Sequence, residues 1–359
     1  MKILIITVFL LILYNPVVSK DNRIDGIELK FNHGRIFAHS PKINPVIKNE
    51  PNSVQVNLLL PTLGYHKWPH LYRYPTFGVG FHFLDFGNQK VLGYALTLDG
   101  FMRVPIINSP NFKFFYRAET GSSYITRKYD SIQNPLNLAI GSSLNMFIYL
   151  GFESIIQYKR LGLVSAIGMN HYSIGSLTYP NLGINVPAYS FGINYLFRKE
   201  KPEILKFEFP ELTNRHELWF FGATGRKRPV QTHGYYIIAS ISANYAYRLN
   251  QKRKFGFGFD QFYDESIDLF LTGGEKHRAK SEIYYRSAIN VSHELLFGDL
   301  SLITQYARYI YKKTKKNSST YYRIGFRYHF NNLFCILALK THLIANADFV
   351  EWGVGYSLN

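Results

Sequence analysis

The sequence predicts an all-β protein, a closed antiparallel transmembrane β-barrel of about 14 strands, with 12 to 16 possible. Along many segments apolar residues alternate with small or polar ones, as on a strand whose successive side chains point to opposite faces. The apolar face is rich in aromatic residues, since the 359 residues include 28 Tyr and 29 Phe. The other face carries Gly, Ser, Asn and charges, which favours a polar lumen over the second hydrophobic layer of a β-sandwich.

The N-terminus predicts an export signal. Lys2 supplies a positive charge, residues 3–14 form an apolar run, and small residues lead up to Ser19. The run is shorter than the roughly 20 apolar residues that a membrane-spanning helix needs. We therefore expect a signal peptide over residues 1–19 and a single outer-membrane barrel domain over residues 20–359.

Alternating segments recur from about residue 25 to the end of the chain. In the segment 188–197, Phe191 and Ile193 share one face, and Gly192 and Asn194 share the other. The clearest such segments are residues 81–87, 91–101, 144–156, 160–169, 188–197 and 348–359. Turn-forming or charged clusters separate them at residues 107–111, 126–135, 198–203, 272–280 and 312–320. Closing such strands into a barrel would pair every backbone group within lipid.

Charge and cysteine content narrow the class of protein. The formal charge of +17 suits the phosphates of a lipid surface, and no nucleic-acid-binding motif is visible. The single Cys335 allows no intrachain disulfide. No second apolar stretch reaches 18 residues, which excludes an ordinary helical membrane protein.

One predicted strand carries a polar pair on its apolar face. By parity, His171 and Ser173 lie with Leu163 and Met169 and point towards lipid, where a polar group is costly unless it has partners near the interface. Residues two apart on a strand are separated by about 6.6–6.8 Å along its axis, so their side chains can approach each other. A His beside a Ser hydroxyl can activate a serine nucleophile.

A third group should hold the imidazole in one tautomer. Asn185 has the parity of the apolar face of the next strand, so we expect it across the hairpin from His171. No Asp or Glu occurs between Glu153 and Glu200, so a local acidic third member is absent. An amide oxygen can orient a His, although it stabilises an imidazolium less than a carboxylate does. The alternative, a polar strand end followed by a Pro/Asn/Gly turn, stays open.

The stretch HYSIGSLTYPNLGIN, residues 171–185, resembles the signature of outer-membrane lipid A 3-O-deacylases, the acyloxyacyl hydrolase-like family. In that family a His–x–Ser pair lies on the outer face of a β-barrel, and a Pro–Asn–x–Gly loop follows it. The family hydrolyses an ester-linked acyl chain of lipid A. The resemblance implies His171 as general base and Ser173 as nucleophile. Residues 255–266 and 340–356 resemble segments of a longer, Bacteroidetes-type branch.

The resemblance also assigns roles to the neighbouring residues. It implies oxyanion donors in the backbone at Ile174 and Gly175. Ile174 stands where the family usually has Asn, and Asn185 stands where its best-known branch has Glu. Asn185 is thus the expected third catalytic residue.

These observations lead to one functional hypothesis and one alternative. We expect an outer-membrane serine esterase, a carboxylic ester hydrolase, that acts on lipid A or lipopolysaccharide and needs no metal and no cofactor. The alternative is a non-enzymatic barrel, porin-like or structural, with a decayed motif. Two further polar groups are expected to be structural: the adjacent His39 and Ser40, which would point to opposite faces, and a solvated rim of Asp260, Asp264 and Glu265.

Overall fold

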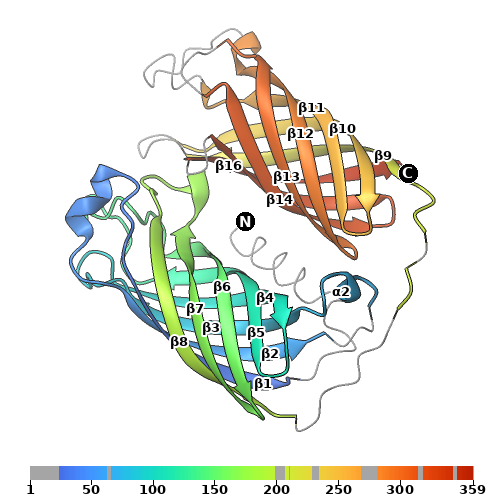
Figure 1. The fold of residues 1–359 in the computed structure, drawn as a ribbon. Coiled ribbons are helices and arrows are strands. Elements are labelled where there is room, and N and C mark those ends of the chain that lie inside the picture. Colours follow the sequence, from blue (N-terminus) through green and yellow to red (C-terminus); the bar gives the residue numbers. More distant parts are fainter. Residues whose placement is uncertain are drawn as a thin grey trace. The chain divides into compact units, whose positions relative to one another are not determined.

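The computed structural model describes residues 24–62, 66–198, 207–209, 211–228, 234–267, 281–313, 318–342 and 346–358. Within these residues, 16 antiparallel strands close into two barrels of eight strands each (Figure 1). The chain divides into two compact units, the first comprising Met1–Ile174 and Pro180–Glu208, the second Gly175–Tyr179 and Phe209–Asn359. We refer to the first barrel (β1–β8) and the second barrel (β9–β16).

The first barrel runs as a meander in which each strand pairs with its sequence neighbours, and β1 pairs with β8 to close the sheet. A 3₁₀ helix, η1 (Pro41–Val46), follows β1, and a one-turn helix, α2 (Trp68–Leu71), follows β2. The strands are β1 (Gly26–Gly34), β2 (Asn52–Pro61), β3 (Thr76–Asp85), β4 (Tyr94–Asn108), β5 (Phe112–Ile125), β6 (Leu144–Tyr158), β7 (Leu161–Ser173) and β8 (Ile184–Leu196).

The second barrel repeats this plan, and β9 pairs with β16 to close it. The 3₁₀ helix η3 (Ser281–Tyr284) precedes β12, and η2 (Gly175–Leu177) also belongs to this unit. The strands are β9 (His216–Lys227), β10 (Tyr236–Asn250), β11 (Arg253–Asp264), β12 (Tyr285–Phe297), β13 (Leu300–Tyr311), β14 (Thr320–Phe330), β15 (Leu333–His342) and β16 (Asn346–Leu358). Among the described residues, no helix has the length and hydropathy needed to cross a membrane.

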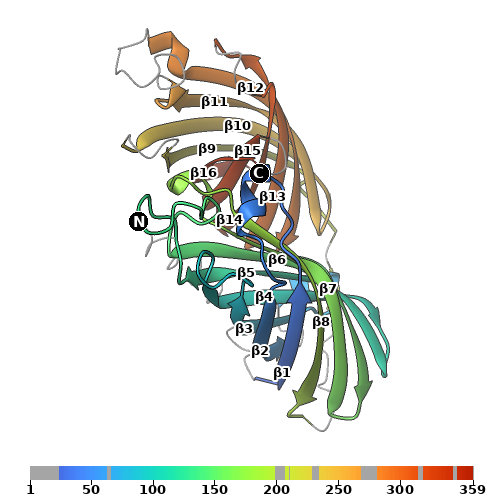
Figure 2. The same ribbon diagram turned by 90° about the vertical axis from the view of Figure 1, so that its left-hand side faces the viewer.

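The predicted all-β, closed antiparallel class is confirmed, but one barrel of about 14 strands is wrong. Figure 2 shows the two sets of strands, blue to green and yellow to red, each wrapped around its own axis. Alternation predicts that strands exist and which face is apolar. It does not determine whether β8 pairs with β1 or with β9, because that choice is made by backbone hydrogen bonds at the strand edges. The predicted signal peptide, residues 1–19, lies outside the described residues and stays a prediction.

The predicted apolar and polar faces are confirmed along the strands. On β8 the side chains of Phe191 and Ile193 are exposed, whereas Ser190 and Asn194 are buried in the barrel interior. The interior of an eight-stranded barrel is just wide enough for side chains to fill it. In both barrels many of the buried interior side chains are charged.

Buried ion pairs fill the lumen of the first barrel. The guanidinium of Arg117, which is fully buried, contacts Glu28 at 3.2 Å, Glu153 at 3.1 Å and also Glu119. Arg103 contacts Glu28 at 2.6 Å and Glu153 at 2.9 Å. Each carboxylate is therefore shared between cations, which offsets the cost of removing these charges from water.

The second barrel has a similar charged interior. Arg323 contacts Asp260 at 3.0 Å and also Glu351, and Lys227 contacts Asp264 at 2.8 Å. Asp260 and Asp264 are fully buried, so the expected solvated rim of acidic residues is wrong for these two. Their carboxylates lie on the inward face of β11 because they have the parity of the buried Phe262.

Arg117→Met should lower the free energy of unfolding of the first barrel by about 3–5 kcal/mol, because it leaves buried carboxylates without their shared cation. Arg127→Met, at an exposed position beyond β5, is the matched control and should change it little. Urea unfolding in detergent micelles measures both. Equal losses in the two variants would contradict the lumen assignment.

The second barrel should fold without the first, because all eight of its strands lie within Phe209–Asn359 and its sheet closes on itself. A fragment of residues 209–359, refolded in detergent, should give a β-rich circular dichroism spectrum and a compact band on unheated gels that shifts on boiling. If the fragment refolds only when the first barrel is present, the inference that each sheet closes independently of the other is wrong.

Candidate active site

The predicted polar pair lies at the end of β7. His171 and Ser173 have the outward parity of the exposed Leu163 and Ile167, and both are partly buried. Between them Tyr172 points inward and is fully buried, where it packs on Phe86 and Phe147 with ring centroids 5.4 and 5.1 Å away. The buried Tyr172 therefore fixes the backbone so that its two neighbours face outward.

The third predicted residue lies directly opposite the first. His171 of β7 pairs with Asn185 of β8 in the antiparallel register. The imidazole Nδ1 lies 2.6 Å from the amide Oδ1 of Asn185. The structure thus brings together His171, Ser173 and Asn185 at one strand end.

The loop between β7 and β8 contacts this group through its Pro–Asn–x–Gly sequence. Asn181 donates a hydrogen bond from Nδ2 to Ser173 Oγ over 2.9 Å. Gly183 has a φ of +78°, and a Cβ there would lie 3.1 Å from Cε1 of His171 and 3.3 Å from Cβ of Ser173. The backbone of Gly183 therefore lies against both side chains, where a left-handed conformation and close approach favour glycine.

A second histidine, His39, completes the group. Its Nδ1 lies 3.0 Å from the amide nitrogen of Asn185, and its Nε2 lies 3.0 Å from the carbonyl oxygen of Leu182. Asn181 has a sequence signal, because it is the Asn of the Pro–Asn–x–Gly loop. His39 has none, because 146 residues separate it from Asn185.

The segment that carries His39 is held by backbone pairing and by an apolar cluster. The N–H of Phe37 donates to the carbonyl oxygen of Asn185 over 2.8 Å, in an isolated antiparallel bridge. Ile36 on one side of His39, and Ile43 and Val46 of η1 on the other, are buried in the same cluster. The other members include Leu84, Phe86, Leu92, Ile125, Ile140, Phe147, Tyr172, Ile184 and Val186.

These contacts determine the direction of each hydrogen bond. The carbonyl of Leu182 can only accept, so a neutral His39 carries its proton on Nε2 and its Nδ1 accepts from the Asn185 amide. The amide oxygen then faces His171, which donates from Nδ1. The remaining nitrogen of His171, Nε2, keeps its lone pair and can act as a base.

The two predicted oxyanion residues follow Ser173 in the chain. Ile174 is buried, with 6% of its surface exposed. Gly175 begins η2 and has a φ of +64°. Their proposed role in binding an oxyanion stays a prediction.

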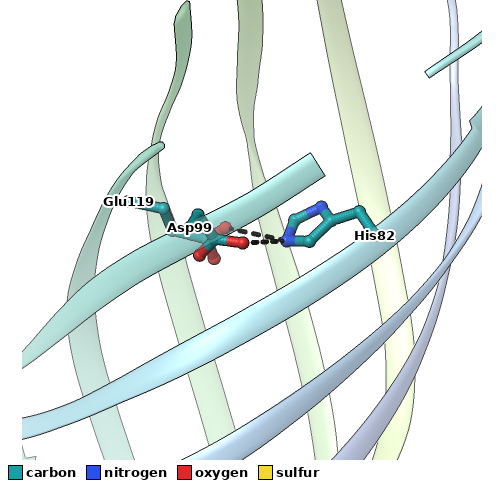
Figure 3. A group of neighbouring side chains, drawn as sticks. All are labelled: His82, Asp99 and Glu119. Atoms are coloured by element: carbon teal, nitrogen blue, oxygen red, sulfur yellow. Dashed lines mark ion pairs between the residues drawn. The ribbon is translucent and has the colours of Figure 1, made fainter. Parts of the chain in front are cut away.

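A separate group of potential metal ligands lies inside the first barrel. Figure 3 shows His82, Asp99 and Glu119, from β3, β4 and β5, pointing towards one another. Nε2 of His82 lies 2.9 Å from Asp99 and 3.4 Å from Glu119. Glu119 also pairs with Arg117, so its carboxylate already has a cationic partner within the lumen.

Residues 214–359 match the family "Acyloxyacyl hydrolase, C-terminal domain". The acyloxyacyl hydrolase match spans β9 to β16, and it includes residues 255–266 and 340–356. The family resemblance drawn from the sequence is thereby confirmed for this part of the chain.

The only His–x–Ser pattern of the sequence, at residues 171–173, precedes the acyloxyacyl hydrolase match. No curated protein matches the chain. Among solved structures, the outer membrane enzyme PagL is 15% identical, with 46% of this chain and 97% of that chain covered and a TM-score of 0.32. Two mutant porins of Rhodopseudomonas blastica are 8% and 9% identical, with 93% of this chain and 99% of each porin covered and TM-scores of 0.18 and 0.17.

The ring protonation of His171 can be measured directly. In protein labelled with ¹⁵N at histidine, a neutral His171 should carry its proton on Nδ1, because Asn185 presents an oxygen to it. Asn185→Leu removes this acceptor and should abolish the preference. A wild-type His171 protonated on Nε2 would contradict the hydrogen-bond directions given above.

Proposed function

We propose that the protein is an outer-membrane serine esterase that removes an ester-linked acyl chain from lipid A or a related acylated glycolipid. The observation that carries the proposal is the Asn185–His171 hydrogen bond beside Ser173 on the outward face of β7. The acyloxyacyl hydrolase match over residues 214–359 supports the class of reaction.

The proposed chemistry begins with Ser173. Its Oγ attacks the acyl carbonyl while His171 Nε2 takes the hydroxyl proton, and Asn185 orients the resulting imidazolium. The tetrahedral intermediate collapses when His171 passes the proton to the departing sugar alkoxide. Water, activated by the same imidazole, then attacks the acyl-enzyme and releases the fatty acid.

The oxyanion formed in this reaction needs hydrogen-bond donors. We assign this role to the side chain of Asn181, because its Nδ2 donates to Ser173 Oγ over 2.9 Å and an N–H donor therefore lies beside the nucleophile. The backbone N–H groups at Ile174 and Gly175 are further candidate oxyanion donors, as the family resemblance implies. A positioned donor of this kind contributes about 2.7–4 kcal/mol to transition-state stabilisation in serine hydrolases.

The position of the site favours a lipid substrate. The exposed apolar side chains of Ile167, Met169, Tyr189 and Phe191 share the outer wall with the His171–Ser173 pair. Such a wall lies among acyl chains in a membrane, so a lipid ester can reach Ser173 without leaving the bilayer. The formal charge of +17 is complementary to the phosphates of lipid A.

Ser173→Ala should reduce acyl release at least about a thousandfold, because it removes the nucleophile. Ser165→Ala is the matched control, since Ser165 lies on the same strand with the same parity and bonds only across to Ser154 at 2.7 Å among the contacts described. The assay is mass spectrometry of lipid A incubated with purified protein in detergent micelles.

Two outcomes would contradict the proposal. Equal fatty-acid release by wild type and Ser173→Ala would exclude serine catalysis at this site. No release by wild type from lipid A or from a panel of acylated glycolipids would instead favour the non-enzymatic barrel.

A further inference from the structure

We propose that His39 is a positioning residue of this active site, which holds the side-chain amide of Asn185 so that its oxygen faces His171. The inference rests on the proposed function and assigns a role to a residue that the family signature does not contain. His39 contacts neither the nucleophile nor the base in the described hydrogen bonds. It acts through Asn185.

The need for such a residue follows from the chemistry of an amide. A carboxylate presents an acceptor oxygen on either side, whereas an amide presents oxygen on one side and N–H₂ on the other. If the nitrogen of Asn185 faced His171, Nδ1 of the imidazole would have to accept. The proton of a neutral His171 would then lie on Nε2, and the ring could not take a proton from Ser173.

His39 selects the productive orientation because its own protonation is set by a backbone carbonyl. Leu182 O, 3.0 Å from Nε2 of His39, can only accept, so the single proton of the neutral ring lies there. Nδ1 of His39 is then an acceptor, 3.0 Å from the nitrogen of Asn185. Three hydrogen bonds therefore connect the carbonyl of Leu182 to the imidazole of His171, through His39 and then Asn185. Each bond fixes which atom of the next side chain donates and which accepts.

The position of His39 is well supported by its neighbours. The Phe37 bridge to Asn185 places the segment alongside β8, and the buried Ile36, Ile43 and Val46 anchor it on both sides of His39. His39 itself is only partly buried, so its ring contributes little to that cluster. Its substitution can therefore be tested without dismantling the anchor.

The first test compares two substitutions of His39. His39→Phe keeps a ring of similar size but removes both hydrogen bonds. Its kcat should fall about ten- to a hundredfold with KM little changed, by analogy with the outer-shell groups that orient metal-binding histidines. His39→Gln offers one acceptor and one donor from its amide and should restore most of the activity. Equal losses in the two variants would overturn the proposal.

The second test uses Asn185→Asp as a background. A carboxylate needs no orientation, so His39→Phe should cost at least about tenfold less there than in the wild type. A purely structural role for His39 would give the same loss in both backgrounds. That result would overturn the proposal even if both single variants lose activity.

The third test does not depend on activity. In His39→Phe, the ¹⁵N shifts of a neutral His171 should show loss of the Nδ1-protonated preference, and His39→Gln should retain it. Unchanged His171 shifts in His39→Phe would overturn the inference. The proposed function fails separately, if Ser173→Ala is as active as wild type, so the two failures are distinguishable.

Discussion

Closure of each sheet after eight strands is the constraint on which the rest of the structure depends. An open strand edge leaves backbone groups unpaired, and the edge of β8 is paired with β1. The resulting barrel is too narrow to leave an empty lumen, and charged side chains centred on Arg117 fill it. The lumen of the first barrel is therefore occupied by its own side chains, and the candidate site lies on the outer wall, at the end of β7.

The candidate site follows from that closure together with the geometry of one hairpin. Antiparallel pairing sets Asn185 opposite His171, and the β7–β8 loop brings Asn181 and the backbone of Gly183 against Ser173. As the proposed third member, the amide of Asn185 would be weaker than a carboxylate, because it cannot neutralise an imidazolium. An amide must also be oriented so that its oxygen, and not its nitrogen, faces His171. In the proposal above, His39 sets this orientation from outside the hairpin.

Much of the hairpin was predictable from the sequence, and the remainder was not, for physical reasons. Parity along β7 and β8 predicts the outward direction of His171 and Ser173 and the position of Asn185, because the period of a strand is two. The number of barrels is not encoded in parity, since β8 has the same alternation whether it pairs with β1 or β9. The contact partners of His39 and of the buried Asp260 could not be predicted from the sequence either, because they come from strands distant in the chain.

The charged interiors have an electrical consequence. An ion that entered the first barrel would have to separate Arg103 from Glu28, which lies 2.6 Å away, and Arg117 from its carboxylates. An ion that entered the second barrel would have to separate Lys227 from Asp264, which lies 2.8 Å away. The desolvation cost of those groups, once parted, would oppose every step of permeation. Both interiors, as far as the structure describes them, are thus electrostatic plugs, and a planar bilayer that contains the protein should carry no steady single-channel current.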